Sequence, residues 1–122
     1  MSWFGKKEAS AFKWENLETI SDLDNYIELS HEQLIAFFKH STRCSISSMA
    51  KSRFERNWNL DPKKITPVYL DLIAHRAISN ALAERFKVMH ESPQLLLIKN
   101  GECIYNTSHN DISAEKLADF IS

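Results

Sequence analysis

The spacing of apolar residues changes several times along the chain, and each change predicts a new element. Residues 16–20 alternate like a short strand, and Ser21 then offers a helix N-cap with acidic residues in the first turn. The next apolar run, residues 33–39, has strand length and is typical of a strand buried on both faces. Helical spacing follows Cys44, with Ile46, Met49, Ala50, Phe54 and Trp58 forming one apolar stripe.

The second half of the chain repeats this change of period. Residues 67–72 read as a strand and residues 74–86 as an amphipathic helix. Strand patterns at 94–98 and 102–106 flank Asn100-Gly101, a pair typical of a tight hairpin turn in which both residues take positive φ. A last helix is expected over residues 111–121.

These elements follow one another as β-α-β-α-β-α-β-β-α. Parallel strands joined by helices and closed by an antiparallel hairpin predict an α/β protein with a thioredoxin-like fold, in which helices flank a central mixed sheet. Residues 14–122 are expected to form this single domain, after an irregular leader over residues 1–13. We expect the leader's Trp3, Phe4 and Phe12 to dock on the domain rather than to drive self-association.

Composition narrows the classes of function. Fifteen basic and sixteen acidic residues give a net charge of −1, which favours neither nucleic acid nor an anionic membrane as partner. No apolar stretch approaches the ~20 residues that span a bilayer. The first residues do not resemble a secretory signal, so we expect a cytoplasmic protein with reduced thiols. The two cysteines and five histidines lack the paired spacing of a zinc site, so no metal is expected.

Cys44 is the candidate reactive residue. A strand that delivers a cysteine to a helix N-terminus places the thiol where the helix dipole and free N–H groups favour a thiolate. The alternative is a buried, unreactive cysteine, but the surrounding residues are polar. Ser47 stands where a dithiol protein would carry its second cysteine. Its hydroxyl either donates to the thiolate or is one more polar group of the first turn, while Arg43 either supports the thiolate or points to solvent.

Two segments resemble a known family. HSTRCSIS at residues 40–47 and VMHESPQ at residues 88–94 together resemble the monothiol bacilliredoxin-like proteins of the bacillithiol system, and the resemblance runs from about Trp14 to the C-terminus. It implies a thioredoxin fold, a nucleophile at Cys44 and a cis-proline loop at Ser92-Pro93, where the Ser92 backbone would pair with an extended substrate. The family usually has proline directly after the cysteine, whereas this chain has Ser45, which restores an N–H donor near the sulfur.

The resemblance implies a thiol-disulfide oxidoreductase that removes bacillithiol from protein mixed disulfides by a monothiol route. Bacillithiol would be a co-substrate, with no bound cofactor, and the partners would be bacillithiolated client proteins and the bacillithiol disulfide reductase. The alternative is a non-catalytic thioredoxin-like protein whose cysteine senses oxidants or carries an adduct. A glutathione-type iron–sulfur protein is disfavoured because no glycine lies near Cys44. Cys103 is expected to be a packed thiol rather than a resolving one, and His40 and His90 to be structural or surface residues.

Overall fold

A single mixed sheet organises the computed structural model, which describes residues 12–121. Its strands are β1 (Glu15–Asn16), β2 (Leu34–His40), β3 (Ile65–Asp71), β4 (Gln94–Lys99) and β5 (Glu102–Ser108). They lie in the order β1-β3-β2-β4-β5, with β1, β3 and β2 parallel and β4 and β5 antiparallel to their neighbours. The predicted element order and fold class are confirmed.

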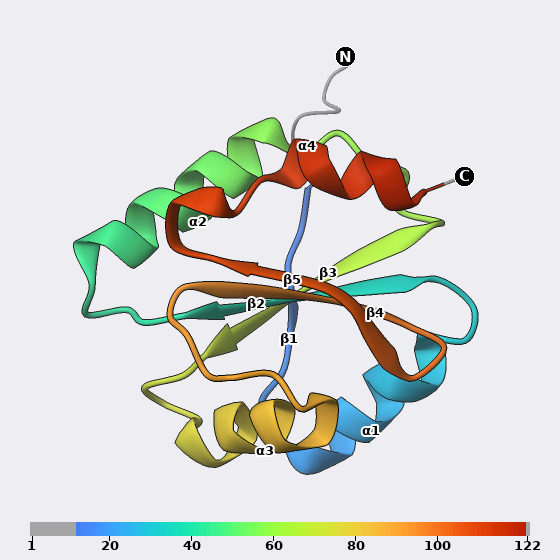
Figure 1. Cartoon of the computed structure of the whole chain (residues 1–122), viewed down its shortest axis with the longest axis horizontal. Coiled ribbons are helices and arrows are strands. Elements are labelled where there is room, and N and C mark those ends of the chain that lie inside the picture. The colour runs from blue at the N-terminus through green and yellow to red at the C-terminus, as the bar shows by residue number, and fades with distance from the viewer. Residues whose placement is uncertain (1–11, 122) are drawn as a thin grey trace, which may run out of the picture.

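Helices cover both faces of the sheet (Figure 1). The helices α1 (Ile20–Leu29) and α3 (Arg76–Phe86) lie on one face, and α2 (Ser45–Asn57) and α4 (Ala114–Leu117) lie on the other. Short 3₁₀ turns, η2 (His109–Asp111) and η3 (Ala118–Phe120), flank α4. Because β2 is central, each of its faces meets a separate layer of helices.

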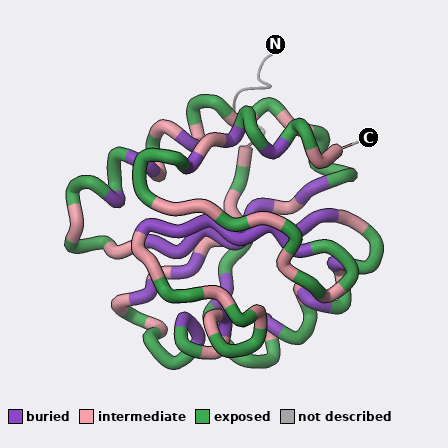
Figure 2. The backbone as a smooth tube through the Cα atoms, in the orientation of Figure 1, coloured by how far each residue is buried: buried purple, intermediate pink, exposed green. Residues whose placement is uncertain are grey.

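The core is divided by β2, all seven residues of which are buried. Phe37 packs in the cluster on the α1 and α3 side, and Phe38 packs in the cluster on the α2 and α4 side. Figure 2 shows the buried strands crossing the centre of the molecule. A run without alternation is what a strand buried on both faces requires, and the predicted strand at residues 33–39 is confirmed with a shift of one residue.

The first helix begins earlier than predicted. Thr19 is its N-cap: the Thr19 hydroxyl accepts from the Asp22 N–H at 2.9 Å, and the Asp22 carboxylate accepts from the Thr19 N–H at 3.2 Å. This capping box starts the helix at Ile20, so the prediction of a strand over 16–20 with Ser21 as N-cap is wrong. The strand β1 is only two residues long and pairs with β3.

The apolar stripe of α2 is only partly buried. Ile46 and Met49 are 58% and 67% exposed, and the buried face is formed instead by Ser47, Ala50 and Phe54. Residues three or four positions apart share one face of a helix, so Ser47, Ala50 and Phe54 lie together on the buried face, and Met49 lies away from it. The predicted apolar stripe is therefore not the buried face at Ile46 and Met49.

The last two predicted helices are shorter than expected. The Asp71 carboxylate accepts from the N–H groups of Ile73 and Ala74, which holds a turn there and delays α3 to Arg76. The C-terminal helix is broken into η2, α4 and η3, because Ile112 is extended and buried between η2 and α4.

The hairpin and the docking of the leader's last aromatic residue match expectation. Asn100 and Gly101 have φ of 53° and 79°, as the two-residue turn requires. The ring of Phe12 lies 5.1 Å from that of Trp14 and 5.4 Å from that of Trp58, between centroids. Trp3 and Phe4 lie outside the described residues.

Candidate thiol site

Cys44 caps the N-terminus of α2, directly beyond the carboxyl end of β2. Its backbone is extended, with φ −111° and ψ 119°, and its C=O accepts the first helical hydrogen bond from the Ser48 N–H at 3.0 Å. The Cys44 N–H donates to Ser41 O at 3.2 Å, which closes the turn between strand and helix. The free thiol is half-buried. The predicted strand-to-helix junction is therefore present, with the cysteine at its tip.

The first turn of α2, which Cys44 precedes, has unpaired N–H donors, and the Cys44 side chain makes no capping hydrogen bond to them. Among the described residues, the N–H groups of Ser45, Ile46 and Ser47 have no hydrogen-bond acceptor. The first N–H groups of any helix lack intrahelical partners, and together with the helix dipole they favour an anion. A thiolate at Cys44 would be such an anion.

Ser47 is turned toward the protein interior. It is fully buried, its Oγ lies 2.8 Å from Nδ1 of His40, and it accepts from the Ser41 N–H at 3.2 Å. Burial, and then the Lys51 ammonium, lower the pKa of His40, which favours a neutral imidazole at this contact. Among the described residues the Ser47 hydroxyl contacts His40 and Ser41 and not Cys44, so its donation to a Cys44 thiolate stays a prediction.

The other two supporting residues are at the surface. Ser45 and Arg43 are both exposed. Within residues 12–121, Arg43 makes no hydrogen bond or ion pair, so its guanidinium is turned to solvent, and its support for the thiolate stays a prediction. Ser45 occupies the first helical position, where its N–H is one of the unpaired donors.

The loop before β4 lies at the same end of the sheet as Cys44. The Ser92–Pro93 peptide bond is cis, which confirms the expectation for this pair. Lys39 of β2 pairs in register with Gln94 of β4, so the end of β2 and the start of β4 lie side by side. The N–H and C=O groups of Ser92 have no partner among the described residues.

A buried polar cluster beneath this loop was missed by the sequence reasoning. Lys39 and Gln94 are each 1% exposed, and the Lys39 ammonium donates to Gln94 Oε1 at 2.9 Å and contacts His90 Nδ1 at 2.8 Å. His90, expected to be structural or at the surface, is an exposed residue that bonds inward. The signal in the sequence was a lysine at the end of a fully buried strand, since a buried ammonium requires partners.

Cys103 lies in β5 and packs against the core cluster on the α1 and α3 side. Its Sγ is 3.4 Å from Tyr105 O, and burial raises the pKa of the Cys103 thiol. Since β5 is the edge strand and β4 separates it from β2, Cys103 is not placed beside the start of α2. This agrees with the expected packed thiol.

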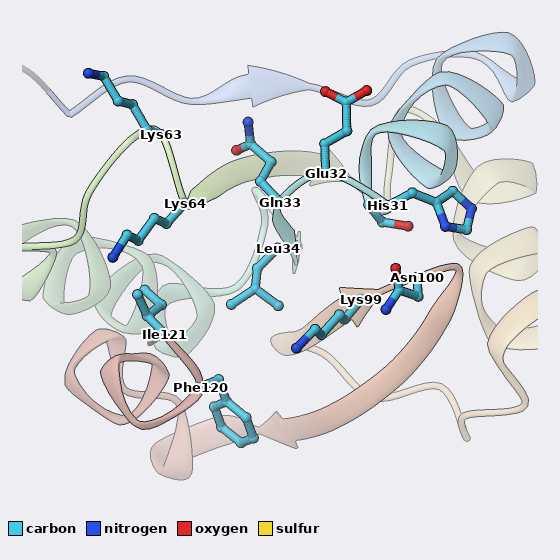
Figure 3. Close-up of a pocket in the computed structure, with 11 residues that line it drawn as sticks. His31, Glu32, Gln33, Leu34, Lys63, Lys64, Lys99, Asn100, Phe120 and Ile121 are labelled. Atoms are coloured by element: carbon cyan, nitrogen blue, oxygen red, sulfur yellow. The ribbon is translucent and has the colours of Figure 1, made fainter.

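A cavity of about 300 Å³ lies elsewhere, at the opposite end of β2. Leu34, the first residue of β2, points into it toward Phe120, and Lys99 lies alongside (Figure 3). Cys44 lies beyond the other end of β2, after His40 and a short turn, so the seven-residue strand, about 20 Å long, separates the cavity from the thiol. Within residues 12–121 no group of three potential metal ligands gathers, and no helix is long and apolar enough to cross a bilayer.

Comparison with known proteins gives one family. The family model described as monothiol bacilliredoxin BrxC matches residues 15–117. A solved structure with a thioredoxin fold is 30% identical, with a TM-score of 0.73 over 86% of this chain and 90% of that chain. The oxidised mitochondrial thioredoxin 3 of Saccharomyces cerevisiae has a TM-score of 0.68 at 16% identity, over 88% of this chain and 92% of that chain, and shows the fold alone.

Proposed function

Because the chain belongs to the monothiol bacilliredoxin family, we propose that it removes bacillithiol from protein mixed disulfides. The family and fold make it a thiol oxidoreductase. The observation that carries the finer proposal is the lone thiol of Cys44 at the N-cap of α2, with a buried serine in the position of a resolving cysteine. Such a site can form a mixed disulfide and cannot resolve it within the chain.

The chemistry requires two exchanges. The Cys44 thiolate attacks the bacillithiol sulfur of the mixed disulfide, and the S–S bond breaks so that the client cysteine leaves as a thiolate and takes a proton from solvent. A second bacillithiol, as thiolate, then attacks the bacillithiol sulfur on Cys44 and releases it as bacillithiol disulfide. In the net reaction one free bacillithiol is oxidised into the disulfide and the client cysteine is reduced to a thiol, so the electrons balance. The bacillithiol disulfide reductase would restore the thiol in a reducing cytoplasm.

The unpaired N–H groups at the start of α2 support the first exchange. They stabilise Cys44 both as the attacking thiolate and as the leaving thiolate in the second exchange, since both carry negative charge on the same sulfur. Ser45 adds a donor here that the family's usual proline lacks.

The loop before β4 supports recognition of a protein client. The unpaired N–H and C=O groups of Ser92 offer an extended client segment the main-chain hydrogen bonds of a short strand addition. Pro93 is buried and directly precedes β4, whose first residue pairs with Lys39 of β2, so Ser92 and Cys44 lie at the same end of the sheet. The client would thus be bound on either side of its mixed disulfide.

The direct test incubates a bacillithiolated client with the full chain and bacillithiol, and follows the client's mass. We expect loss of the bacillithiol adduct with the wild-type chain and Cys103→Ala, no loss with Cys44→Ala, and a transient adduct on Cys44. An adduct that forms on Cys44 but is not released by bacillithiol would favour the rival sensor or adduct carrier. Loss of activity in Cys103→Ala alone would refute the site.

A further inference from the structure

The ammonium of Lys39 lies beneath the loop that precedes Pro93. Lys39 is 1% exposed, and its Nζ lies 2.8 Å from His90 Nδ1 and 2.9 Å from Gln94 Oε1, within hydrogen-bond distance of both. Lys39 belongs to the central strand β2, while His90 belongs to the loop, so this contact joins the most buried strand to the loop.

Gln94 extends the same connection to the loop backbone. Its Nε2 donates to Met89 O at 2.9 Å, and its Oε1 accepts from the Glu91 N–H at 3.3 Å as well as from Lys39. Gln94 is itself 1% exposed. Residues 89–91 are therefore held from below at two backbone groups and one side chain, immediately before Ser92.

The Lys39 ammonium relies on His90 as one of its two hydrogen-bond acceptors. Among the described residues, the Lys39 ammonium forms no ion pair, and its partners are the neutral Gln94 amide and His90. Glu91 and Arg76 are the other charged groups that act on the pair, and Glu91 is also 3.5 Å from His109. A protonated His90 would present an N–H to the ammonium in place of a lone pair.

We propose that Lys39 is the positioning residue for the client-binding loop, and that its contact with neutral His90 makes client binding sensitive to acid. This inference rests on the proposed function, because it assigns Ser92 to binding the client backbone. Protonation of His90 places two cations 2.8 Å apart, so the contact breaks and the loop before Ser92 loses one of its supports. Cys44 itself is untouched by that change.

The test separates binding of the client from thiol chemistry. Steady-state rates are measured with bacillithiol as reductant and two substrates, a bacillithiolated peptide that can pair with the Ser92 backbone and the mixed disulfide of bacillithiol with 2-mercaptoethanol, which is too small to do so. Each substrate releases its own thiol and yields bacillithiol disulfide, so both have a measurable net turnover. We expect Lys39→Met to raise the KM for the peptide about tenfold more than the KM for the small mixed disulfide, as removal of a charged hydrogen bond implies. An equal effect on both substrates would overturn the positioning role.

Substitutions at the exposed His90 provide the pH readout without disturbing the core. From about pH 7.5 to about pH 4.5, a window extended downward because burial and the Lys39 ammonium lower the pKa of His90, the ratio of kcat/KM for the peptide to that for the small mixed disulfide should fall in the wild type. His90→Asn keeps an acceptor close to the position of Nδ1 but cannot be protonated, so its ratio should stay flat. His90→Ala should have a low ratio at every pH, and His90→Asn should restore it.

The matched control is His31→Asn, an exposed histidine at the far end of β2, whose ratio should fall in acid as in the wild type. If His90→Asn falls as steeply as the wild type, the acid sensitivity does not come from His90 and the proposal is overturned. If the wild type reacts with neither substrate, the proposed function fails and takes this inference with it. Reaction with both substrates at a ratio unaffected by Lys39 or His90 overturns only the inference.

Discussion

The Ser47 hydroxyl lies 2.8 Å from Nδ1 of His40, and this contact fills the position where a dithiol protein would carry its second sulfur. His40 is the last residue of β2 and is buried beside the ring of Tyr69, 5.7 Å away between centroids. The first turn of α2 is therefore anchored to the central strand by a side chain. The serine holds the helix that presents Cys44, which gives it a structural part in a single-thiol site.

Ser47→Ala should lower the free energy of unfolding by about 1–3 kcal/mol. The substitution leaves the buried Nδ1 of His40 and the N–H of Ser41 without their partner, and buried polar groups that lose a hydrogen bond carry that penalty. Urea denaturation followed by tryptophan fluorescence measures the change. Ser48→Ala, one residue along on the exposed side of the same helix, should stay within about 0.5 kcal/mol of the wild type. Equal effects of the two substitutions would contradict an anchoring role.

Ser45→Pro should slow the alkylation of Cys44 by iodoacetamide at neutral pH by about threefold. Proline removes one of the three unpaired N–H groups at the start of α2, and one hydrogen bond to an anion is worth at least that factor. Quenched alkylation with mass detection gives the rate. Ser45→Ala keeps the N–H and removes only the hydroxyl, so it tells the two groups apart. A rate in Ser45→Pro equal to or above that of the wild type would show that this amide does not support the thiolate.

Much of the thiol site was predictable because it depends on local sequence. The uninterrupted apolar run before Cys44 could only suit a central strand, and the Asn100-Gly101 pair fixed the closing hairpin through its backbone preferences. The cis peptide at Ser92–Pro93 followed from the family resemblance rather than from the proline itself, since most such bonds are trans.

The features that the sequence did not predict all depend on how separate helices, strands and loops pack together. Nothing near Lys39 indicates that it meets His90 and Gln94, which lie more than fifty residues away. The periodicity of α2 placed Met49 on its apolar stripe, but only the position of the helix relative to the sheet decides which part of that stripe is covered. Ser47 was correctly placed in the first turn, yet its direction depended on the buried His40 at the end of the strand.

The buried lysine also makes a prediction about stability at alkaline pH. Burial lowers the pKa of Lys39 from 10.5 to about 8, an effect that Glu91 partly offsets. Between these two values the unfolded chain binds more protons than the folded chain, so the contribution of Lys39 to the free energy of unfolding rises with pH through this window. Below about pH 8 the full penalty of burying the charge is present, and above 10.5 it is gone.

The difference between wild type and Lys39→Met isolates this contribution, because the other lysines and tyrosines titrate in both proteins. Urea denaturation from about pH 7 to about pH 10 should show the wild type gaining stability relative to Lys39→Met as the pH rises. Lys99→Met, which removes an exposed lysine at the far end of β4, is the matched control and should give a flat difference. A flat difference for Lys39→Met as well would mean that the ammonium keeps its ordinary affinity for the proton beneath the loop. In that case its partners, His90 and Gln94, would compensate fully for its burial.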